Sequence, residues 1–548
     1  MSALRDIAEQ WVALDPDEQD RATVQALLDA GDDEGLRHLF LPPLTFGTAG
    51  LRGPEMAGSA GMNRLTVRRA TQGVVSWMKQ AGLSPERGVV VGRDARRGSE
   101  AFNTEVVEVL LGAGVRVYEM PRPLPTPFVA YAVKALGAAA GVMITASHNP
   151  AADNGYKLYG PEGSQIVSPV DSMVEAAMAA AGAATLHSRE SELHEYVTEE
   201  LLETYREHMV ARFRVEDNEF PIVYTPMHGV GGDEVTSALA RAGFGRVLPV
   251  RQQMEPDGNF PTVSFPNPEE PGALDLALAL ANERNASVIL ANDPDADRLA
   301  VAARDSAGAW RVLRGDEIGW LLASALLPLA QPGDVVATSI VSSTMLSAMA
   351  AAAGVAYADT LTGFKWVAKA AGTGRLLFGY EEAIGYGVDN AVGDKDGVSA
   401  ALAVAKLAFD LAVEGKTVFD RLDDIERTFG VHAGSQVSLR VTPPAGREVL
   451  LATMARVRQT PPTTIGGLAV TEVIDLEAGW RGLPATEGLI WRLGEASRVI
   501  VRPSGTEPKL KAYIEVVEAP DEDVAAARAR AAVVVDALRR DLETLLAL

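Results

Sequence analysis

The chain contains no cysteine among its 548 residues. Disulfide bonds, a thiolate nucleophile and a cysteine-ligated metal site are therefore excluded. Long apolar runs are also missing, because charged residues interrupt the short ones, and no transmembrane span is predicted. The first residues, MSALRDIAEQW, lack the charged and then apolar pattern of a signal peptide. Together these absences favour a cytoplasmic protein with no membrane partner.

Positive charge is scarce relative to negative charge. Lys and Arg total 50 and Asp and Glu total 73, which gives a formal net charge of −23. Because phosphate contacts need a basic face, this balance argues against nucleic acid as the main partner. A protein this acidic binds an anionic ligand where basic residues gather locally. Basic residues should therefore cluster at loops, while nothing in the sequence predicts an oligomeric state.

A chain of this length is too long for one core and should divide into about three to five domains. Apolar content of 47%, with 51 Gly and 31 Pro, is typical of a globular protein. Strands and helices alternate in three successive stretches, which predicts parallel sheets with crossover helices. After about residue 430 the pattern becomes β-rich and then helical, which predicts an α+β domain. The predicted segments are a helical N-terminal extension at 1–40 and domains at 41–212, 213–325, 326–430 and 431–548.

The predicted elements come from short apolar runs and from helical spacing. The predicted strands are 89–91, 115–119, 138–144, 222–225, 287–291, 335–339, 376–379 and 497–501. The predicted helices are 100–112, 127–136, 233–242, 316–327, 344–353 and 522–546.

Residues 141–157 read GVMITASHNPAADNGYK. The apolar run 138–144 predicts a buried strand that ends in a polar loop. Ser147 then lies at the carboxyl end of a parallel strand, where open α/β sheets place their chemistry. His148 is adjacent, and Lys157 can fold back toward the same loop. A Ser-His pair in a loop is more often a simple turn, and this spacing is not that of a Ser-His-Asp triad.

Three carboxylates follow another predicted strand, in the segment Asn292-Asp-Pro-Asp-Ala-Asp-Arg298. Asp293, Asp295 and Asp297 are two residues apart and follow a strand, so they can converge on one hard cation. An EF-hand is disfavoured because its Gly and its final Glu are not at the required positions. The pattern predicts a site for Mg²⁺, and a solvated acidic turn is the alternative.

A third strand end carries Gly379-Tyr-Glu-Glu-Ala-Ile-Gly-Tyr386. Glu381 and Glu382 can accept hydrogen bonds from sugar hydroxyls more firmly than neutral groups can. Paired carboxylates also occur in glycoside hydrolases, but adjacent residues on one loop say little about that geometry. Lys395, in Gly393-Asp-Lys-Asp-Gly397, is either a ligand contact or a solvated surface lysine.

The last block, Arg502-Pro-Ser-Gly-Thr-Glu-Pro508, follows the apolar strand 497–501. Backbone N–H groups of this loop can form an anion nest, to which the arginine and the hydroxyls add contacts. Two lysines in the next strand are two residues apart and therefore share one face. A loose Ser/Gly turn is the alternative, and it leaves the basic flanks unexplained. The residues concerned are Arg502, Ser504, Gly505, Thr506, Lys509 and Lys511.

These four blocks, in this order, resemble the motifs of the α-D-phosphohexomutases, the family of phosphoglucomutases and phosphomannomutases. The resemblance covers about residues 40–518. It implies an α/β fold of four domains around one central cleft, with three mixed α/β sandwich domains and a C-terminal α+β domain. It also implies an enzyme in which a phosphorylated serine hands its phosphate to a sugar phosphate.

Earlier segments extend the resemblance. Phe46-Gly-Thr-Ala-Gly-Leu-Arg-Gly53 resembles the family's N-terminal active-site segment, in which Arg52 would face the phosphoserine. Gly92-Arg-Asp-Ala-Arg96 resembles another strand-end loop, whose Arg93 and Asp94 are expected to be structural. His228 also lies at a predicted strand end, where it either faces the cleft or is a structural histidine.

The resemblance implies a role for each group of residues. The catalytic residues would be Ser147 as the phosphorylated nucleophile, Arg52, and His148 and Lys157, which are the candidates for proton transfer. The Mg²⁺ ligands would be Asp293, Asp295, Asp297 and a phosphoserine oxygen of Ser147. The substrate would contact Arg298, Thr362, Gly363, Glu381, Glu382, Lys395, Arg502, Ser504, Gly505, Thr506 and Lys511. A sugar bisphosphate such as glucose 1,6-bisphosphate would be the activator.

The N-terminal extension and the GYEEAIGY form of the third block are most similar to the phosphoglucomutase-2/phosphopentomutase branch. The Gly-Glu-x-Ser-Gly form of many bacterial phosphomannomutases and phosphoglucosamine mutases is absent. The expected reaction is interconversion of a sugar 1-phosphate and 6-phosphate, with glucose as first choice. Alternatives are a mannose or pentose phosphate, a glucose 1,6-bisphosphate synthase and, outside the enzymes, a phosphosugar-binding regulator.

Overall fold

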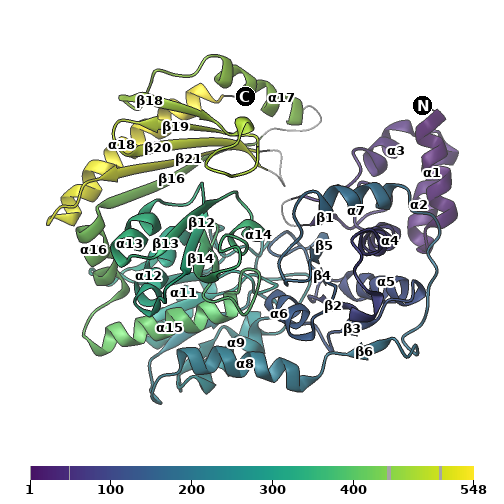
Figure 1. Ribbon diagram of the computed structural model, residues 1–548, viewed down its shortest axis with the longest axis horizontal. Coiled ribbons are helices and arrows are strands. Elements are labelled where there is room, and N and C mark those ends of the chain that lie inside the picture. Colours follow the sequence, from purple (N-terminus) through teal and green to yellow (C-terminus); the bar gives the residue numbers. More distant parts are fainter. Residues whose placement is uncertain (1, 48–49, 441–445, 505–508, 548) are drawn as a thin grey trace. The chain divides into compact units, whose positions relative to one another are not determined.

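The computed structural model describes residues 2–47, 50–440, 446–504 and 509–547 (Figure 1). Two compact units divide the chain: Met1–Leu313 with Ile384–Asp410, and Arg314–Ala383 with Leu411–Leu548. Within the residues that the structure describes, the strands form four sheets. Among these residues, no helix combines the length and the apolar character that crossing a membrane requires.

The first unit begins with a small helical cluster. Its helices are α1 (Ser2–Leu14), α2 (Glu18–Ala30) and α3 (Asp33–Phe40). Asp17 and Asp32 accept backbone hydrogen bonds at the starts of α2 and α3, which satisfies donors that a helix leaves unpaired. Trp11 packs edge-on against Phe40, with ring centroids 5.7 Å apart, so the cluster has an apolar core of its own.

The first sheet carries the serine block. Its strands, in spatial order, are β1 (Leu51–Pro54), β5 (Asp153–Tyr159), β4 (Ala140–Ile144), β2 (Val89–Arg93), β3 (Val117–Glu119) and β6 (His194–Tyr196). The helices of this region are η1 (Pro85–Arg87), α4 (Arg64–Gln80), α5 (Ser99–Gly112), α6 (Thr126–Leu136) and α7 (Val170–Ala179). Every residue of β4 is buried, as expected for a strand covered on both faces.

The predicted parallel pairing is confirmed for the strands that the alternation covered, because β2 is parallel to both β3 and β4. β1 and β5 are antiparallel to their neighbours, so the sheet is mixed, as the resemblance implied. The reason is the length of a connection. Only residues 145–152 join β4 to β5, and a parallel crossover needs a dozen residues or more. The chain therefore turns back at the serine loop and brings Lys157 alongside Met143 in the register.

The second sheet of this unit carries the aspartate block. Its strands, in spatial order, are β11 (Trp310–Val312), β10 (Ala300–Arg304), β9 (Val288–Ala291), β7 (Ile222–Thr225) and β8 (Val247–Pro249). β7, β8 and β9 are parallel, and β10 and β11 add an antiparallel edge. The helices of this region are α8 (Glu199–Phe213), α9 (Gly232–Arg241), α10 (Arg251–Met254) and α11 (Asp275–Arg284). The chain later returns to this unit with β15 (Gly385–Gly387) and the start of α15 (Gly397–Val413).

In the second unit, a parallel sheet carries the third block. Its strands are β13 (Ala356–Thr360), β12 (Asp334–Ser339) and β14 (Arg375–Glu381). The helices of this region are α12 (Gly315–Leu326), η2 (Leu327–Leu329), α13 (Met345–Ala353), α14 (Phe364–Val367) and α16 (Val418–Phe429). Glu381 is the last residue of β14, so the carboxylate pair lies at the carboxyl end of a parallel strand.

An antiparallel sheet completes the second unit. Its strands, in spatial order, are β16 (Val431–Arg440), β21 (Lys509–Glu518), β20 (Ser497–Pro503), β19 (Leu489–Leu493), β18 (Leu468–Asp475) and β17 (Thr464–Ile465). The remaining helices are α17 (Gly446–Gln459), η3 (Leu476–Ala478) and α18 (Val524–Leu545). Figure 1 shows α18 running along this sheet, where it contacts β16 and β21. The α+β architecture expected for the end of the chain is therefore present.

Candidate active site

Ser147 lies in the loop that follows β4, and its side chain is buried. Its backbone is left-handed, with φ at 51°. A residue with a Cβ atom occupies this region at a cost of about 1–3 kcal/mol, so the surrounding structure must hold it there. Such strain is concentrated at functional sites, which makes the serine loop the first candidate in this unit.

Two side chains contact the Ser147 hydroxyl. It donates a hydrogen bond of 2.7 Å to Asp293 Oδ2, and His148 Nδ1 lies 3.2 Å from Ser147 Oγ. Burial, together with the nearby Arg298 and Arg52, lowers the pKa of the His148 imidazole well below its usual value. His148 is therefore neutral near pH 7, with its Nδ1 atom close to the serine oxygen.

The three aspartates of the second sheet's loop are fully buried side by side. Oxygen atoms of Asp293, Asp295 and Asp297 lie within 4.8 Å of one another. Ala296, between two of them, has a left-handed backbone with φ at 52°, which turns the chain so that alternate carboxylates face the same point. The prediction that spacing of two residues lets these carboxylates converge is correct in geometry.

Lys157 ties this cluster to the first sheet. From β5, its ammonium donates hydrogen bonds of 2.6 Å to Asp295 Oδ2 and to Asp297 Oδ2. Burial disfavours the charged ammonium, but these two carboxylates outweigh that effect and raise the pKa of Lys157. Lys157 is therefore a protonated residue that lies against the acidic cluster.

The remaining oxygens of the cluster fit a cation. Asp295 Oδ1 and Asp297 Oδ1 are buried and have no hydrogen-bond partner among the described residues. Burial and the neighbouring Asp295 and Asp297 raise the pKa of the Asp293 carboxyl to about 8, which shows how poorly the protein alone compensates this charge. Three buried carboxylates, two of which keep an oxygen without a hydrogen-bond partner among the described residues, are a donor set that suits a hard cation such as Mg²⁺.

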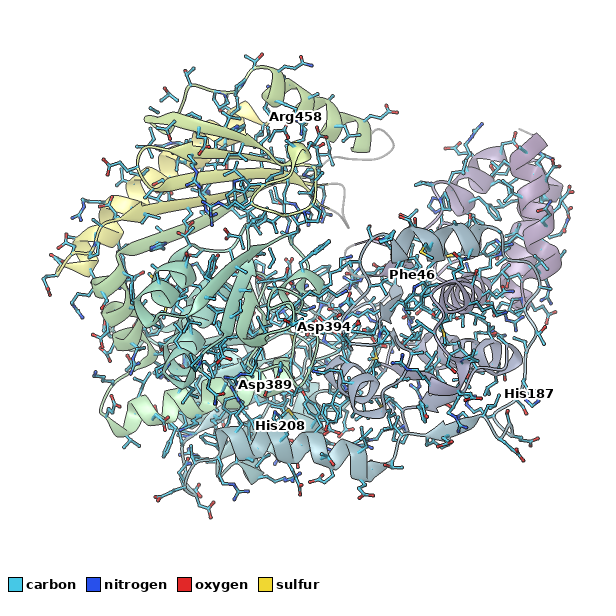
Figure 2. The ribbon with its side chains drawn as sticks, in the orientation of Figure 1. Phe46, His187, His208, Asp389, Asp394 and Arg458 are labelled. Carbon is cyan, nitrogen blue, oxygen red and sulfur yellow. The ribbon has the colours of Figure 1, made fainter. Side chains whose placement is uncertain are left out.

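Lys395 is a buried residue of this cluster and not a solvated surface lysine. Its ammonium lies 3.2 Å from Asp297 Oδ2. The neighbouring Asp394, labelled in Figure 2, accepts a hydrogen bond of 2.9 Å from the hydroxyl of Tyr159. Earlier in the same stretch of chain, Asp389 Oδ2 lies 2.9 Å from His208 Nε2, and both residues are labelled in the same view. These contacts fasten the loop that delivers Lys395.

Two arginines add positive charge beside the serine. Arg52 lies on β1 and its Nη1 donates a hydrogen bond of 3.3 Å to Asn149 Oδ1. Arg298 Nε lies 3.8 Å from Asp297 Oδ1. Burial and the proximity of Arg298 lower the pKa of the Arg52 guanidinium. Two guanidinium groups that repel each other beside His148 suit an anion such as a phosphate group, which would relieve this repulsion.

Arg96 fastens the serine loop, and the sequence did not point to it. The guanidinium is buried, lies 3.2 Å from Asp94 Oδ2 through Nε, and stacks over the ring of Phe260 at 5.0 Å. It donates to four loop carbonyls: those of Ser147 at 2.6 Å, Asn149 at 2.7 Å, Pro150 at 2.7 Å and Asp153 at 3.0 Å. These bonds hold the strained backbone of the serine loop. The sequence feature that could have indicated Arg96 is its place in the strand-end segment Gly92–Arg96, where it is the second arginine.

Other residues expected near this site have structural contacts. Asp94 is buried and accepts hydrogen bonds from the hydroxyl of Ser99 and the backbone N–H of Arg96. Arg93 Nη2 lies 3.8 Å from Glu100 Oε2. His228 is buried, with Nε2 2.9 Å from the hydroxyl of Thr262. Phe46, labelled in Figure 2, packs edge-on against Tyr156.

The second unit holds the glutamate pair. The backbone N–H of Gly363 donates a hydrogen bond of 2.7 Å to Glu381 Oε1. Gly363 has φ at 108°, a conformation that residues with a Cβ atom rarely adopt, so the loop needs glycine at this position. Thr362 is partly buried beside it. Gly363 and Glu381, which are both predicted to contact the substrate, are therefore neighbours.

The end of β20 and the start of β21, which flank the last block, lie near Glu382 of the glutamate pair. Arg502 and Lys511 are opposite each other on β20 and β21, and the Arg502 side chain hydrogen-bonds Tyr513. Burial and Asp316 raise the pKa of the Glu382 carboxyl, while the nearby Lys511 lowers it in part. This unit therefore places the basic Lys511 close to the carboxylate of Glu382.

The backbone of the last block is described up to Ser504, whose N–H donates a hydrogen bond of 2.8 Å to the carbonyl of Lys509. Gly505 and Thr506 lie outside the described residues. The anion nest predicted for this loop therefore stays a prediction.

Four models of one protein family match successive parts of the chain. They describe phosphoglucomutase/phosphomannomutase α/β/α domain I at residues 43–184, domain II at 203–308, domain III at 314–429 and the C-terminal domain at 451–541. The chain belongs to the phosphoglucomutase/phosphomannomutase family. The four-domain α/β architecture that the motifs implied is confirmed by these matches and by the four sheets.

Curated relatives are similar along most of their length. A probable phosphomannomutase of Haemophilus influenzae is 41% identical over 461 residues, which cover 83% of this chain and 93% of the relative. A phosphopentomutase of Mus musculus is 35% identical, with 93% of this chain and 90% of the relative covered. The chain is therefore a phosphotransferase of the isomerase class, and it is similar to the phosphoglucomutase-2/phosphopentomutase branch of the phosphohexomutases.

A solved structure has the same fold. The putative phosphomannomutase of Thermus thermophilus is 24% identical, with 90% of this chain and 99% of that chain covered, and the TM-score is 0.66. At this identity the similarity speaks for the fold alone.

Proposed function

We propose that this phosphohexomutase interconverts a sugar 1-phosphate and a sugar 6-phosphate, with glucose as first choice, through phosphorylated Ser147. The observation that carries the proposal is the contact of Ser147 Oγ with Asp293, the first member of a buried trio of aspartates. Positive charge lies nearby, because Lys157 and Arg298 contact the other two aspartates and Arg52 binds Asn149 of the serine loop. A serine in such surroundings is suited to carry a phosphoryl group.

The proposed reaction has two phosphoryl transfers. In the first, the P–O bond to Ser147 Oγ breaks, a P–O bond to the free hydroxyl of the sugar phosphate forms, and that hydroxyl loses its proton. The product is a sugar bisphosphate. After it turns over, its other phosphoryl group returns to Ser147, and the sugar oxygen that is released takes up a proton. A sugar bisphosphate such as glucose 1,6-bisphosphate also serves as the activator, because it phosphorylates free Ser147.

The aspartate trio would hold Mg²⁺ for this reaction. Asp293, Asp295 and Asp297 would be its protein ligands, with a phosphoserine oxygen of Ser147 as a further ligand. A bound Mg²⁺ supplies charge neutralisation for the transferring phosphoryl group. Lys157 donates hydrogen bonds to Oδ2 of Asp295 and of Asp297, which holds these two carboxylates in fixed orientations.

His148 and Lys157 are the two candidates for proton transfer. His148 Nδ1 lies 3.2 Å from Ser147 Oγ, so this neutral imidazole is placed for proton transfer at the serine oxygen. Lys157 is protonated and contacts the aspartates, which suits it to stabilise negative charge and to donate a proton once that contact shifts.

The residues of the second unit would bind the parts of the substrate that do not react. Glu381 and Glu382 would accept hydrogen bonds from sugar hydroxyls, assisted by Thr362 and Gly363. Arg502, Lys511 and the loop with Ser504, Gly505 and Thr506 would hold the distal phosphate. Lys395 would contact the substrate from the first unit, as would Arg298.

The choice of sugar rests on the motif forms and stays a proposal. The names of the relatives support mannose and pentose phosphates as alternatives, and synthesis of glucose 1,6-bisphosphate is a further one. The predicted domain limits and the cytoplasmic location also stay predictions. A phosphosugar-binding regulator is the non-enzymatic alternative, but it gives no reason for a strained serine in contact with an aspartate trio.

The test is an assay of the purified protein against a panel of sugar 1-phosphates. Glucose, mannose, ribose and N-acetylglucosamine 1-phosphates are each supplied with Mg²⁺ and a trace of glucose 1,6-bisphosphate. The proposal expects formation of glucose 6-phosphate with the highest kcat/KM of the panel. A higher kcat/KM for another sugar would replace glucose, and accumulation of bisphosphate in place of monophosphate would indicate a synthase.

Arg502→Ala should weaken binding of the distal phosphate. A charge-assisted hydrogen bond is worth about 1.5–3 kcal/mol, so kcat/KM should fall roughly 10- to 150-fold. KM should rise and kcat should fall as well, because remote binding energy also positions the reacting hydroxyl. Steady-state kinetics would measure both, with Arg492→Ala, on the neighbouring β19, as the control. Wild-type kcat/KM in Arg502→Ala for each sugar tested would contradict the assignment.

Arg96→Lys should slow phosphoryl transfer while leaving substrate binding nearly unchanged. A lysine ammonium cannot donate hydrogen bonds to all four carbonyls that the Arg96 guanidinium binds. The backbone of Ser147 should therefore leave its left-handed conformation for part of the time. Losing one charge-assisted bond corresponds to a decrease of about 10-fold or more in kcat. Phosphorylation of Ser147, followed by intact mass after mixing with bisphosphate, would show the slower rate. The control is Arg97→Lys at the exposed neighbouring position, and equal rates in the two variants would refute the role of Arg96.

A further inference from the structure

A buried ion pair in the C-terminal sheet is connected to the sugar loop by hydrogen bonds. We propose that Arg498 and Glu515 are positioning residues that set the Glu382 carboxylate for the sugar hydroxyls, acting through residues 339–344. The proposal rests on the proposed function, in which Glu382 binds the sugar. It assigns a specific role to two charged residues of the C-terminal sheet that lie outside the four motif blocks.

Arg498 and Glu515 face each other across neighbouring strands. They are register partners on β20 and β21, both are buried, and Arg498 Nε donates a hydrogen bond of 2.8 Å to Glu515 Oε2. Burial disfavours the charge on Glu515, but Arg498 and His432 outweigh it and hold the pKa of its carboxyl well below the usual value. The pair is therefore a true ion pair in the interior of this unit.

Both members of the pair bind the loop that follows β12. Glu515 Oε1 accepts hydrogen bonds of 2.7 Å from the hydroxyl of Ser343 and from the backbone N–H of Thr344. Arg498 Nη2 donates a hydrogen bond of 2.6 Å to the carbonyl of Ser342. Three consecutive residues are thus held by two charged side chains from the C-terminal sheet, which fixes the direction in which the Ser342 side chain points.

The same loop holds Glu382. The hydroxyls of Ser342 and Ser339 donate hydrogen bonds of 3.1 Å and 3.2 Å to Glu382 Oε2. The backbone N–H of Glu382 donates a hydrogen bond of 3.0 Å to Ser342 Oγ. A shift of Ser342 would therefore move both the carboxylate and the backbone of Glu382.

Energetics explain why a charged pair serves this purpose. A buried ion pair gains little stability over apolar residues of the same size, because desolvation offsets the attraction. Its distinctive contribution is geometric, since two charged groups with several directed bonds admit few arrangements. The pair also shares its strands with the phosphate contacts: Arg502 is four residues beyond Arg498, and Lys511 is four residues before Glu515. Residues spaced by four lie on the same face of a strand, so one rigid strand pair serves both parts of the substrate.

The experiment is a double-mutant cycle on ligand affinity. Titration calorimetry with glucose 1-phosphate measures Kd for the wild type, Glu515→Gln, Glu382→Gln and the double variant. Glu515→Gln should raise Kd about 10-fold, while adding it to Glu382→Gln should change Kd by less than about 2-fold, because the positioned carboxylate is already gone. Inorganic phosphate, measured as a competitor, should bind Glu515→Gln and the wild type equally.

Controls separate positioning from general damage. Glu518→Gln removes a carboxylate from the same strand, where it pairs with Arg530 at the surface, and should leave Kd unchanged. Ser342→Ala provides a second way to break the connection without removing a buried charge, and it should raise Kd as Glu515→Gln does. The proposal would be overturned if Glu515→Gln raised Kd by the same factor with and without Glu382→Gln. It would also be overturned if Glu515→Gln weakened phosphate binding as much as sugar phosphate binding. If the wild type binds phosphate but no sugar phosphate, the proposed function itself fails, and this inference fails with it.

Discussion

Ser147→Ala should reduce mutase turnover by about 1,000-fold or more, to background. The reaction is proposed to pass through a phosphoserine, and alanine offers no oxygen to carry the phosphoryl group. The fold should survive, because alanine tolerates the left-handed backbone at φ 51° as well as serine does. The direct structural loss is the 2.7 Å hydrogen bond to Asp293, so binding of the sugar phosphate should change little.

Intact-mass spectrometry tests this prediction together with the assay. Incubation with glucose 1,6-bisphosphate should add one phosphate to the wild type and none to Ser147→Ala. Ser172→Ala, at an exposed position on α7, is the matched control and should behave as the wild type does. A phosphate that maps to another serine, or full turnover in Ser147→Ala, would remove Ser147 from its proposed role.

The position of Ser147 and of the aspartates was predictable because local patterns suffice. An apolar run followed by a polar loop indicates a strand end, and the sheet then places that end at one edge. The contact between Ser147 and Asp293 joins residues 146 positions apart, yet both follow strands of this kind. Local sequence therefore predicted each loop, and the family resemblance predicted that the loops work together.

Other parts of the site depend on contacts that no local pattern encodes. The sequence left open whether Lys395 is buried, because a lysine between two aspartates is usually solvated. In this fold Lys395 is buried, since Asp394 beside it is buried and Asp297 pairs with its ammonium. Arg96 is similar, since its four acceptors are backbone carbonyls, and any residue type provides a carbonyl. The residue types of the serine loop therefore do not reveal that its carbonyls bind Arg96.

The strand directions show the same limit. Alternation of strands and helices predicts parallel pairing, and it holds where helices connect the strands. β5 follows β4 after a short loop without a helix, so the chain reverses there. The reversal has a consequence for the site, because it carries Lys157 back from the serine loop to the aspartates. The antiparallel strand β5 thus supplies one of the cationic residues, and Lys157 folds back as the sequence allowed.

Asp295→Asn should impair Mg²⁺ use and phosphoryl transfer together. Asparagine preserves the size of the side chain but removes the charge that a hard cation requires, and Asp295 Oδ1 is one of the buried oxygens without a partner among the described residues. Charge neutralisation by a metal is worth several kcal/mol, so kcat/KM should fall by about 100- to 1,000-fold. The half-saturating Mg²⁺ concentration should rise at least about 10-fold, and chelation with EDTA should silence the wild type until Mg²⁺ is restored.

Direct metal binding separates this effect from damage to the ion pair with Lys157. Asp295→Asn also removes a carboxylate that holds Lys157, but Asp297 keeps its own 2.6 Å bond to the same ammonium. Calorimetric titration with Mg²⁺ in the absence of substrate should therefore show weaker binding in Asp295→Asn and normal binding in Asp233→Asn, an exposed control on α9. Normal Mg²⁺ affinity in Asp295→Asn combined with low activity would assign the loss to Lys157. Full wild-type activity after thorough chelation would remove the metal from the mechanism, and the three aspartates would then serve to hold Lys157, Lys395 and Ser147 in place.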